Sequence, residues 1–228
     1  MRKSLMVPLI FGIAGVAVLL GLGKWQVERL AWKERVLADI EAHIRADPVD
    51  LPAEPDPQAD RYLPVKVTGR IGDEALRVLV SQKQVGAGYR VISALDSGGR
   101  RVLLDRGFVP VAVSLSAPAE GEVTVIGNLH WPDERLSATP ENDVAGNIWF
   151  ARDIAQMAQV LGTEPVLVVA RSVSPAQEGI TALPVDASGI PNDHLSYAIT
   201  WFSLAAIWAV MTGVFIWRQR GAAQGARR

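Results

Sequence analysis

The sequence predicts an α+β membrane protein in which two transmembrane helices flank a mostly antiparallel, β-rich exported domain with one covering helix. Three observations predict this fold. Two long runs, Ser4 to Gly23 and Leu195 to Trp217, contain no charged residue, and each reaches the roughly 20 residues that span a hydrocarbon core. Between them, short segments alternate apolar and polar residues, as strands do. One segment in this middle region has helical periodicity instead.

Composition excludes several classes of function. The 228 residues include 23 Lys and Arg against 24 Asp and Glu, and no basic stripe is interleaved with aromatics, so no nucleic-acid partner is expected. The chain has no cysteine, which excludes disulfide exchange, iron–sulfur clusters, thiolate zinc sites and covalent haem attachment. Four scattered methionines argue against a copper carrier.

The first apolar run, in residues 1–23, is predicted to be a transmembrane helix that continues as an amphipathic stalk over residues 24–47. Residues 24–46 contain no Gly or Pro and keep a helical stripe of apolar residues. Basic residues before the run also fit a secretory signal, but the helical pattern continues through its end, which favours a helix. Ala17 and Gly21 form a small-xxx-small pair suited to close helix packing, within the molecule or between copies.

The middle of the chain is predicted to hold a connector and then the β-rich domain. Residues 48–60 contain the prolines of DPVDLPAEPDPQAD and are expected to be extended and stiff. Residues 61–190 are expected to form strands that curl into a partly closed barrel. The expected strands are VKVTGRI (65–71), ALRVLV (75–80), YRVISAL (89–95), RVLLDRGFVP (101–110), EVTVIGNL (122–129) and PVLVVARSV (165–173), and the covering helix is FARDIAQMAQVLG (150–162).

Residues 191–217 are predicted to form the second transmembrane helix. Pro191 suits the start of a helix, and the side chain of Asn192 or Asp193 is expected to cap it.

The basic tail, residues 218–228, and the basic residues before the first span predict that both termini are cytoplasmic. The central domain would then be periplasmic in a bacterium, or in the intermembrane space of a mitochondrion. The chain has no Arg-rich, Ser-rich presequence, which favours the inner membrane of a bacterium.

A chain that crosses a membrane and returns brings the end of the first span beside the start of the second. One stripe of the second helix contains His194, Tyr197, Ala198, Trp201, Ala205 and Trp208. His194 is the candidate axial ligand of a haem iron, and Tyr197 and Trp201 with the alanines would form a flat apolar wall for the macrocycle. The alternative is that the aromatics are interfacial anchors and the histidine belongs to the helix cap.

On the first helix, Trp25, Arg29 and Trp32 share a face. A guanidinium between two indoles is suited to haem propionates, although contact with lipid phosphate explains Arg29 equally well. His43 is expected to be a solvated surface residue, and His130 to end a strand.

Four blocks of this sequence resemble the Surfeit locus family of cytochrome c oxidase assembly factors. They are GKWQVERLAWK (23–33), VKVTGRI (65–71), LLDRGFVP (103–110) and PNDHLSYAITWFSLA (191–205). The resemblance extends over nearly the whole chain, and the first and last blocks are its most specific parts. Phe108 departs from the pattern, since a tryptophan is commoner at this position in the family.

The resemblance implies a two-span membrane protein, not an enzyme, that handles haem a on its way to the catalytic subunit of the haem-copper oxidase. It implies a haem ligand at His194, and it places family positions at Trp25, Arg29, Arg106 and Gly107. The expected partners are the lipid bilayer, the oxidase catalytic subunit and, as a further candidate, haem a synthase. The alternative is a structural adaptor that docks on an oxidase subunit without touching the cofactor. Motifs of the common hydrolases and phosphate-binding enzymes are absent.

Overall fold

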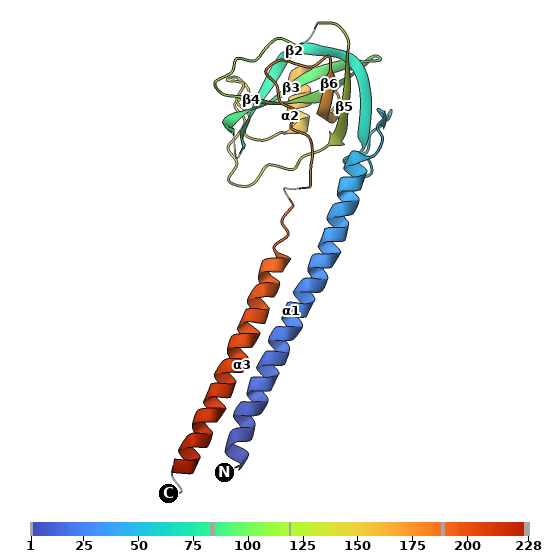
Figure 1. Ribbon diagram of the computed structural model, residues 1–228. Helices are drawn as coiled ribbons and strands as arrows, with labels where there is room; N and C mark the ends of the chain where they lie inside the picture. Colours follow the sequence, from blue (N-terminus) through green and yellow to red (C-terminus); the bar gives the residue numbers. More distant parts are fainter. Residues whose placement is uncertain (1, 83–84, 119, 188–189, 226–228) are drawn as a thin grey trace. The chain divides into compact units, whose positions relative to one another are not determined.

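The computed structural model describes residues 2–82, 85–118, 120–187 and 190–225 (Figure 1). The chain divides into two compact units. One contains residues 1–39 and 188–228 and is helical, and the other contains residues 40–187 and is rich in strands.

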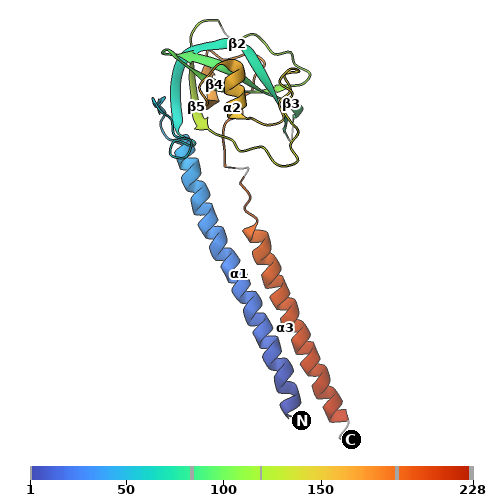
Figure 2. The same cartoon turned by 180° about the vertical axis from the view of Figure 1, so that it is seen from behind.

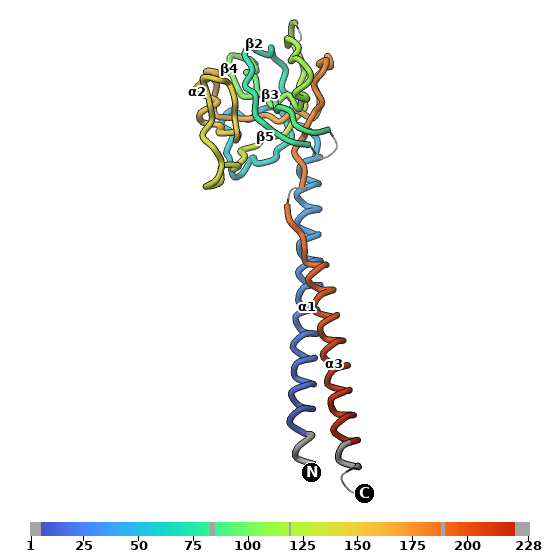
Figure 3. Tube along the Cα trace, turned by 90° about the vertical axis from the view of Figure 1, so that its left-hand side faces the viewer, coloured from blue at the N-terminus to red at the C-terminus, as the bar shows by residue number. Residues whose placement is uncertain are grey.

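Two helices make up the first unit, α1 (Arg2–Arg45) and α3 (His194–Gly225). A single helix covers both the first apolar run and the predicted stalk, because no Gly or Pro interrupts residues 24–46. Met6–Arg45 and His194–Gly221 are long and apolar enough to cross a membrane, which is consistent with a membrane protein. The two helices lie side by side in all three overall views (Figures 1, 2 and 3).

Glycines on α1 bring its backbone against α3. A Cβ atom built on any of three of them would lie within 2.6 Å of an α3 side chain, so a larger residue there would force these side chains or the helices to shift. On the α3 side, Ala198 and Ala205 are each 2% exposed. The glycine contacts are Gly12 with Thr212, Gly15 with Trp208, and Gly23 with Phe202, so the helices are antiparallel.

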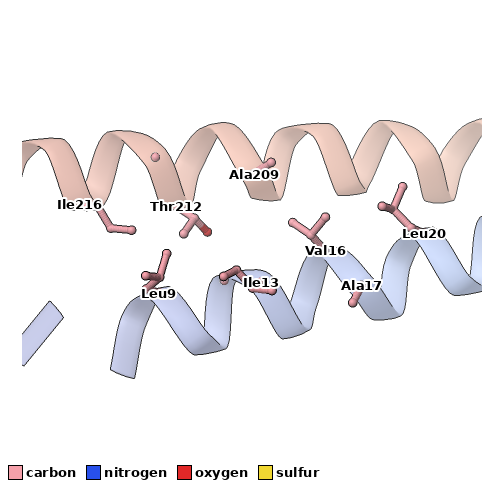
Figure 4. A pocket seen from close by; sticks show the side chains of 10 residues that line it. Leu9, Ile13, Val16, Ala17, Leu20, Ala209, Thr212 and Ile216 are labelled. Carbon is pink, nitrogen blue, oxygen red and sulfur yellow. The ribbon is translucent and has the colours of Figure 1, made fainter. Parts of the chain in front are cut away.

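The predicted small-residue pair of Ala17 and Gly21 does not bring α1 against α3. Both residues are exposed, and nothing lies within 4 Å of a Cβ built on Gly21. At about 100° per residue, this pair is rotated away from the side of α1 that bears Gly12. Ala17 instead borders an apolar groove of about 410 Å³ along the helix pair, which Val16 and Ala209 also line (Figure 4).

The strands of the second unit close into a barrel. The order is β2-β3-β4-β6-β5, and β5 pairs back with β2. Among the strands of the described residues, only the β4–β6 and β1–β2 pairs are parallel, so the prediction of a mostly antiparallel, barrel-like domain is confirmed. The strands are β1 (Val49–Asp50), β2 (Pro64–Gln82), β3 (Gly86–Ser97), β4 (Arg100–Pro110), β5 (Val123–His130) and β6 (Leu167–Ser174).

The domain has two apolar clusters on opposite faces of the sheet. Val102, Leu104 and Val168 belong to the cluster inside the barrel, whereas their neighbours Leu103 and Leu167 belong to the cluster under α2. This alternation follows from the two-residue period of a strand. Both faces of β4 and of the first half of β6 are therefore buried.

The covering helix α2 (Ile154–Leu161) packs on the outside of the barrel (Figure 2). Its buried face and its end at Gly162, in the left-handed conformation with φ 63°, are as predicted. The predicted start at Phe150 is wrong by four residues. Asp153 is extended and its side chain accepts the Gln156 N–H at 3.1 Å, so the helix begins after this cap.

Two further expectations need correction. Residues 65–71 and 75–80 are not separate strands but parts of β2, which bends at a bulge between Ile71 and Ala75. The proline-rich connector is also more structured than expected. Its Val49 and Asp50 form β1 and pair with β2, and Asp56 caps a turn by accepting the N–H of Gln58 at 2.8 Å.

The last turn of α1 belongs to the barrel unit. The Ile44 carbonyl accepts hydrogen bonds from Asn128 Nδ2 at 2.8 Å and from Arg171 Nη1 at 3.2 Å. The final carbonyls of a helix have no partner within it. These two barrel side chains therefore complete the end of α1.

Candidate functional site

The candidate site is at the first turn of α3, where His194 is the first helical residue. The Asp193 carbonyl accepts the Tyr197 N–H at 3.2 Å and the Ser196 hydroxyl at 2.7 Å, so Asp193 begins the helix through its backbone. The expected side-chain cap from Asn192 is not formed, since its Oδ1 has no hydrogen-bond partner among the described residues.

His194 contacts Gln26 of the other helix. The Nδ1 atom of the imidazole lies 2.7 Å from Gln26 Oε1. Gln26 is only 8% exposed, and His194 is half-buried. Because Gln26 presents its amide oxygen, which only accepts, this contact is a hydrogen bond when His194 Nδ1 carries the hydrogen and donates it. The other ring nitrogen, Nε2, then holds the lone pair.

Sequence reasoning missed Gln26, although the sequence contains a signal for it. Gln26 follows Gly12 by fourteen residues, which is four helical turns, so the two lie on the same face of α1. That face packs on α3. A polar residue in phase with close-packed glycines needs a partner on the opposing helix.

The predicted stripe of α3 divides into two parts. Ala198 and Ala205 are buried and Trp201 is half-buried, whereas Tyr197 is 56% exposed. The sequence had suggested that these alanines leave room for a macrocycle between the helices. In the structure they are buried where α1 packs on α3, so this expectation is not met. The reason is that the α1 glycines allow the backbones to close that gap.

Trp25 and Arg29 are both exposed on α1. The Arg29 Cζ atom lies 3.8 Å from the centre of the Trp32 ring, so the guanidinium stacks on one indole rather than between two. At about 100° per residue, Trp25 and Arg29 are turned away from Gln26 in one sense around α1, and Tyr197 is turned away from His194 in the same sense around α3. Because the two helices are antiparallel, residues turned in the same sense from the interface lie on the same side of the helix pair. Trp25, Arg29 and Tyr197 therefore flank the His194–Gln26 contact on one side.

The other two histidines lie outside this site. His43 is exposed, as expected. His130 ends β5, also as expected, and its ring stacks on Tyr62 with centroids 5.4 Å apart. The Nδ1 atom of His130 is buried without a hydrogen-bond partner among the described residues. Burial, reinforced by the positive charge of Arg152, lowers its pKa to about 4.

Gly107 of the third sequence block has a structural role in β4. It has φ of 120°, and a Cβ atom there would lie 2.2 Å from the Thr181 carbonyl oxygen. Its N–H donates to Asp105 Oδ1 at 3.1 Å. The backbone turn that buries the Asp105 side chain therefore requires glycine.

Charged residues around this turn are paired inside the domain. Asp105 is fully buried and accepts hydrogen bonds from Arg90 at 2.5 Å and from Arg152 at 3.2 Å. Burial raises the pKa of Asp105, and the two guanidinium groups oppose this effect. Arg106 is 2% exposed and donates to Gln177 Oε1 at 2.5 Å, and burial lowers its pKa to about 10. These groups are therefore paired with one another within the barrel domain.

Together these features define a class of protein: a closed β-barrel domain in a chain whose two antiparallel apolar helices present one imidazole nitrogen beside exposed aromatics. Among the described residues, no group of three or more acidic or histidine side chains is placed to hold a bare metal ion.

Comparison with known proteins identifies the family. The model of the SURF1 family matches residues 13–206. Surfeit locus protein 1 of Homo sapiens is 31% identical over 210 residues, which cover 82% of this chain and 70% of the human protein. The SURF1-like protein of Monosiga brevicollis is 31% identical over 230 residues, or 92% of this chain and 87% of that protein. The SURF1-like protein of Drosophila melanogaster is 32% identical over 222 residues, covering 83% and 71%.

The chain belongs to the SURF1 family, the Surfeit locus family of oxidase assembly factors. The resemblance seen in the four sequence blocks is thereby confirmed.

Proposed function

We propose that this protein is an assembly factor for cytochrome c oxidase that binds haem a transiently through His194 and assists its insertion into the catalytic subunit. Family membership supports the role in oxidase assembly. The single observation that supports haem handling is the contact between His194 Nδ1 and Gln26 Oε1, which leaves Nε2 as the nitrogen able to bind iron.

The residues at the first turn of α3 fit the chemistry of a haem. When bound, haem supplies an iron that accepts one axial imidazole and a planar apolar ring with anionic propionates. His194 would bind the iron, while Tyr197, Trp201 and Trp25 would offer apolar surface along the side of the helix pair. Arg29 would pair with a propionate, since a guanidinium forms charge-assisted hydrogen bonds with carboxylates. A single imidazole ligand suits transient holding.

The proposed location is the inner membrane of a bacterium, with both termini in the cytoplasm and the barrel in the periplasm. The support is the two apolar helices and the basic residues at Arg218 and Arg220 after the second span. In this orientation His194 would lie near the outer surface of the bilayer. Haem a synthase and the oxidase catalytic subunit are the proposed partners there.

A structural adaptor is the second candidate function. The observation that favours it is the close packing of α1 and α3, in which Ala198 and Ala205 are each 2% exposed. Such a protein would dock on an oxidase subunit through its helices and would not need the imidazole of His194.

Replacement of the protein by its His194→Ala variant in cells that depend on it separates the two functions. The measurements are the haem a content of the oxidase catalytic subunit and coprecipitation of that subunit with the variant. If the protein is a haem carrier, His194→Ala should lower the haem a content of the catalytic subunit at least tenfold while the variant stays folded. Normal haem a content together with normal coprecipitation would support the adaptor and contradict the carrier.

A further inference from the structure

We infer that Gln26 is a positioning residue that holds His194 as its Nδ1–H tautomer and thereby directs Nε2 toward the ligand. The inference rests on the proposed function for the identity of that ligand, a haem iron. The protonation pattern of the ring itself can be measured without haem.

The contact is short and sheltered. The Nδ1–Oε1 distance is 2.7 Å, which lies at the short end of the range for N–H···O hydrogen bonds. Gln26 is 8% exposed, so water competes little for its amide oxygen. It lies on the face of α1 that contains Gly12 and Gly23, and this close packing restricts where its side chain can go.

The chemistry of the acceptor determines the tautomer. Since the Gln26 oxygen can only accept, the proton must be on His194 Nδ1, and a neutral ring then has its lone pair on Nε2. A solvated imidazole favours the opposite tautomer, in which Nε2 bears the proton. Without Gln26, the ring would therefore have to change tautomer before Nε2 could bind a metal.

Such a contact also changes the ligand's properties. An acceptor on the far nitrogen of a metal-binding histidine fixes the ring orientation and increases its basicity, and losing it typically reduces metal affinity by about 10- to 100-fold. The competing explanation is that Gln26 and His194 only tie two helices together, because polar pairs join helices in membranes. The two explanations predict different measurements.

The first experiment uses the full chain in detergent without haem. Nitrogen-15 NMR of the imidazole rings reports the tautomer, and the chain has only 3 histidines, so each can be assigned by substitution. At pH 8, His194 should be in the Nδ1–H form, and Gln26→Met should shift it toward the Nε2–H form. Gln26→Met removes the amide acceptor and approximately preserves side-chain length. An Nε2–H ring in the wild type, or a tautomer unaffected by Gln26→Met, would overturn the inference.

The second experiment uses haem-loaded protein and the matched pair Gln26→Met and Gln26→Glu. Gln26→Met should weaken haem binding about tenfold. The iron–imidazole stretching frequency in resonance Raman spectra should increase in the order Met, Gln, Glu at position 26, because a stronger acceptor makes the imidazole a stronger donor to iron. If Gln26 only joins the two helices, its variants should change the midpoint of thermal unfolding, and the stretching frequency should not follow this order.

The two proposals fail in distinguishable ways. If the wild type binds no haem but its tautomer depends on Gln26, the positioning role stands and the haem proposal falls. If haem binds through His194 but the Met and Glu variants give the wild-type tautomer, affinity and stretching frequency, the positioning role falls and the haem proposal stands.

Discussion

His194 and Gln26 each place a polar group where α1 and α3 meet. A polar group buried away from water costs several kilocalories per mole unless it is hydrogen-bonded. Their mutual contact satisfies His194 Nδ1 and the Gln26 oxygen, which leaves one ring nitrogen for other chemistry. At the scale of the residue, the site is a hydrogen-bonded polar pair in which the His194 Nε2 lone pair is the group that could bind a ligand.

Residue type alone suggested part of this site. An imidazole at the start of an apolar span, and an arginine that shares a helix face with two tryptophans, made His194, Trp25 and Arg29 candidates. Gln26 was not identified because its role depends on which α3 residue faces it, and that depends on the register between the two helices. Register follows from glycine contacts that join distant parts of the sequence.

His130 makes a separate prediction about stability. Its pKa is lowered from 6.5 to about 4 by burial, so the unfolded chain takes up this proton first as the pH falls. Burial of the neutral His130 ring therefore contributes fully to stability above pH 6.5, and this contribution is lost progressively as the pH falls toward 4. We expect lowering the pH from 7 to 5 to reduce the free energy of unfolding by about 1–2 kcal/mol through His130 alone.

Urea unfolding of the full chain in detergent at these two pH values measures the effect. His130→Gln should flatten the difference between them, while His43→Gln, at an exposed position, should leave it unchanged. Equal pH dependence in wild type and His130→Gln would show that this histidine is not buried as described.

At the scale of the helices, the close approach of α1 to α3 depends on Gly12. A Cβ atom at this position would lie 3.0 Å from the Cβ of Thr212. Disulfides typically have Cβ atoms about 3.8 Å apart, so a shift of less than about 1 Å between the helices gives this pair disulfide geometry. Because the chain has no cysteine, a Gly12→Cys/Thr212→Cys pair is free of competing thiols. We expect this pair to form an intramolecular disulfide in most molecules under mild oxidation, detected by mass spectrometry.

The matched control is Gly12→Cys/Met211→Cys. Met211 is adjacent in sequence but rotated by about 100° around α3, and it is 65% exposed. Its disulfide yield should be several-fold lower. Equal yields from the two pairs would contradict the register between α1 and α3.

Strands and helices were predictable where the local pattern was sufficient. The alternation at the start of residues 122–129 and the apolar face of α2 are local signals, and a strand and a helix formed there. The start of α2 was missed because distant groups hold the residues before it: the Asn142 side chain accepts the Phe150 N–H at 2.9 Å. The continuity of β2 was missed because a bulge resembles a break in the alternating pattern.

At the scale of the whole molecule, the sequence predicted two apolar helices flanking a β-rich domain. It did not predict how the barrel closes, since the parallel pairing of β4 with β6 joins segments more than sixty residues apart. The membership of the SURF1 family is confirmed by matches over most of the chain. Orientation in the membrane, client subunits and the cofactor depend on partners outside the chain, so they stay proposals.

The visible spectrum of the full chain purified from cells that make haem a tests the central claim most directly. We predict a Soret band in the wild type that falls at least tenfold in His194→Ala, at equal protein and with an unchanged circular dichroism spectrum. Tyr62→Phe, in the barrel domain and outside the helix site, should keep the band. A wild type without a Soret band, or a band of equal intensity in His194→Ala, would contradict haem binding at His194.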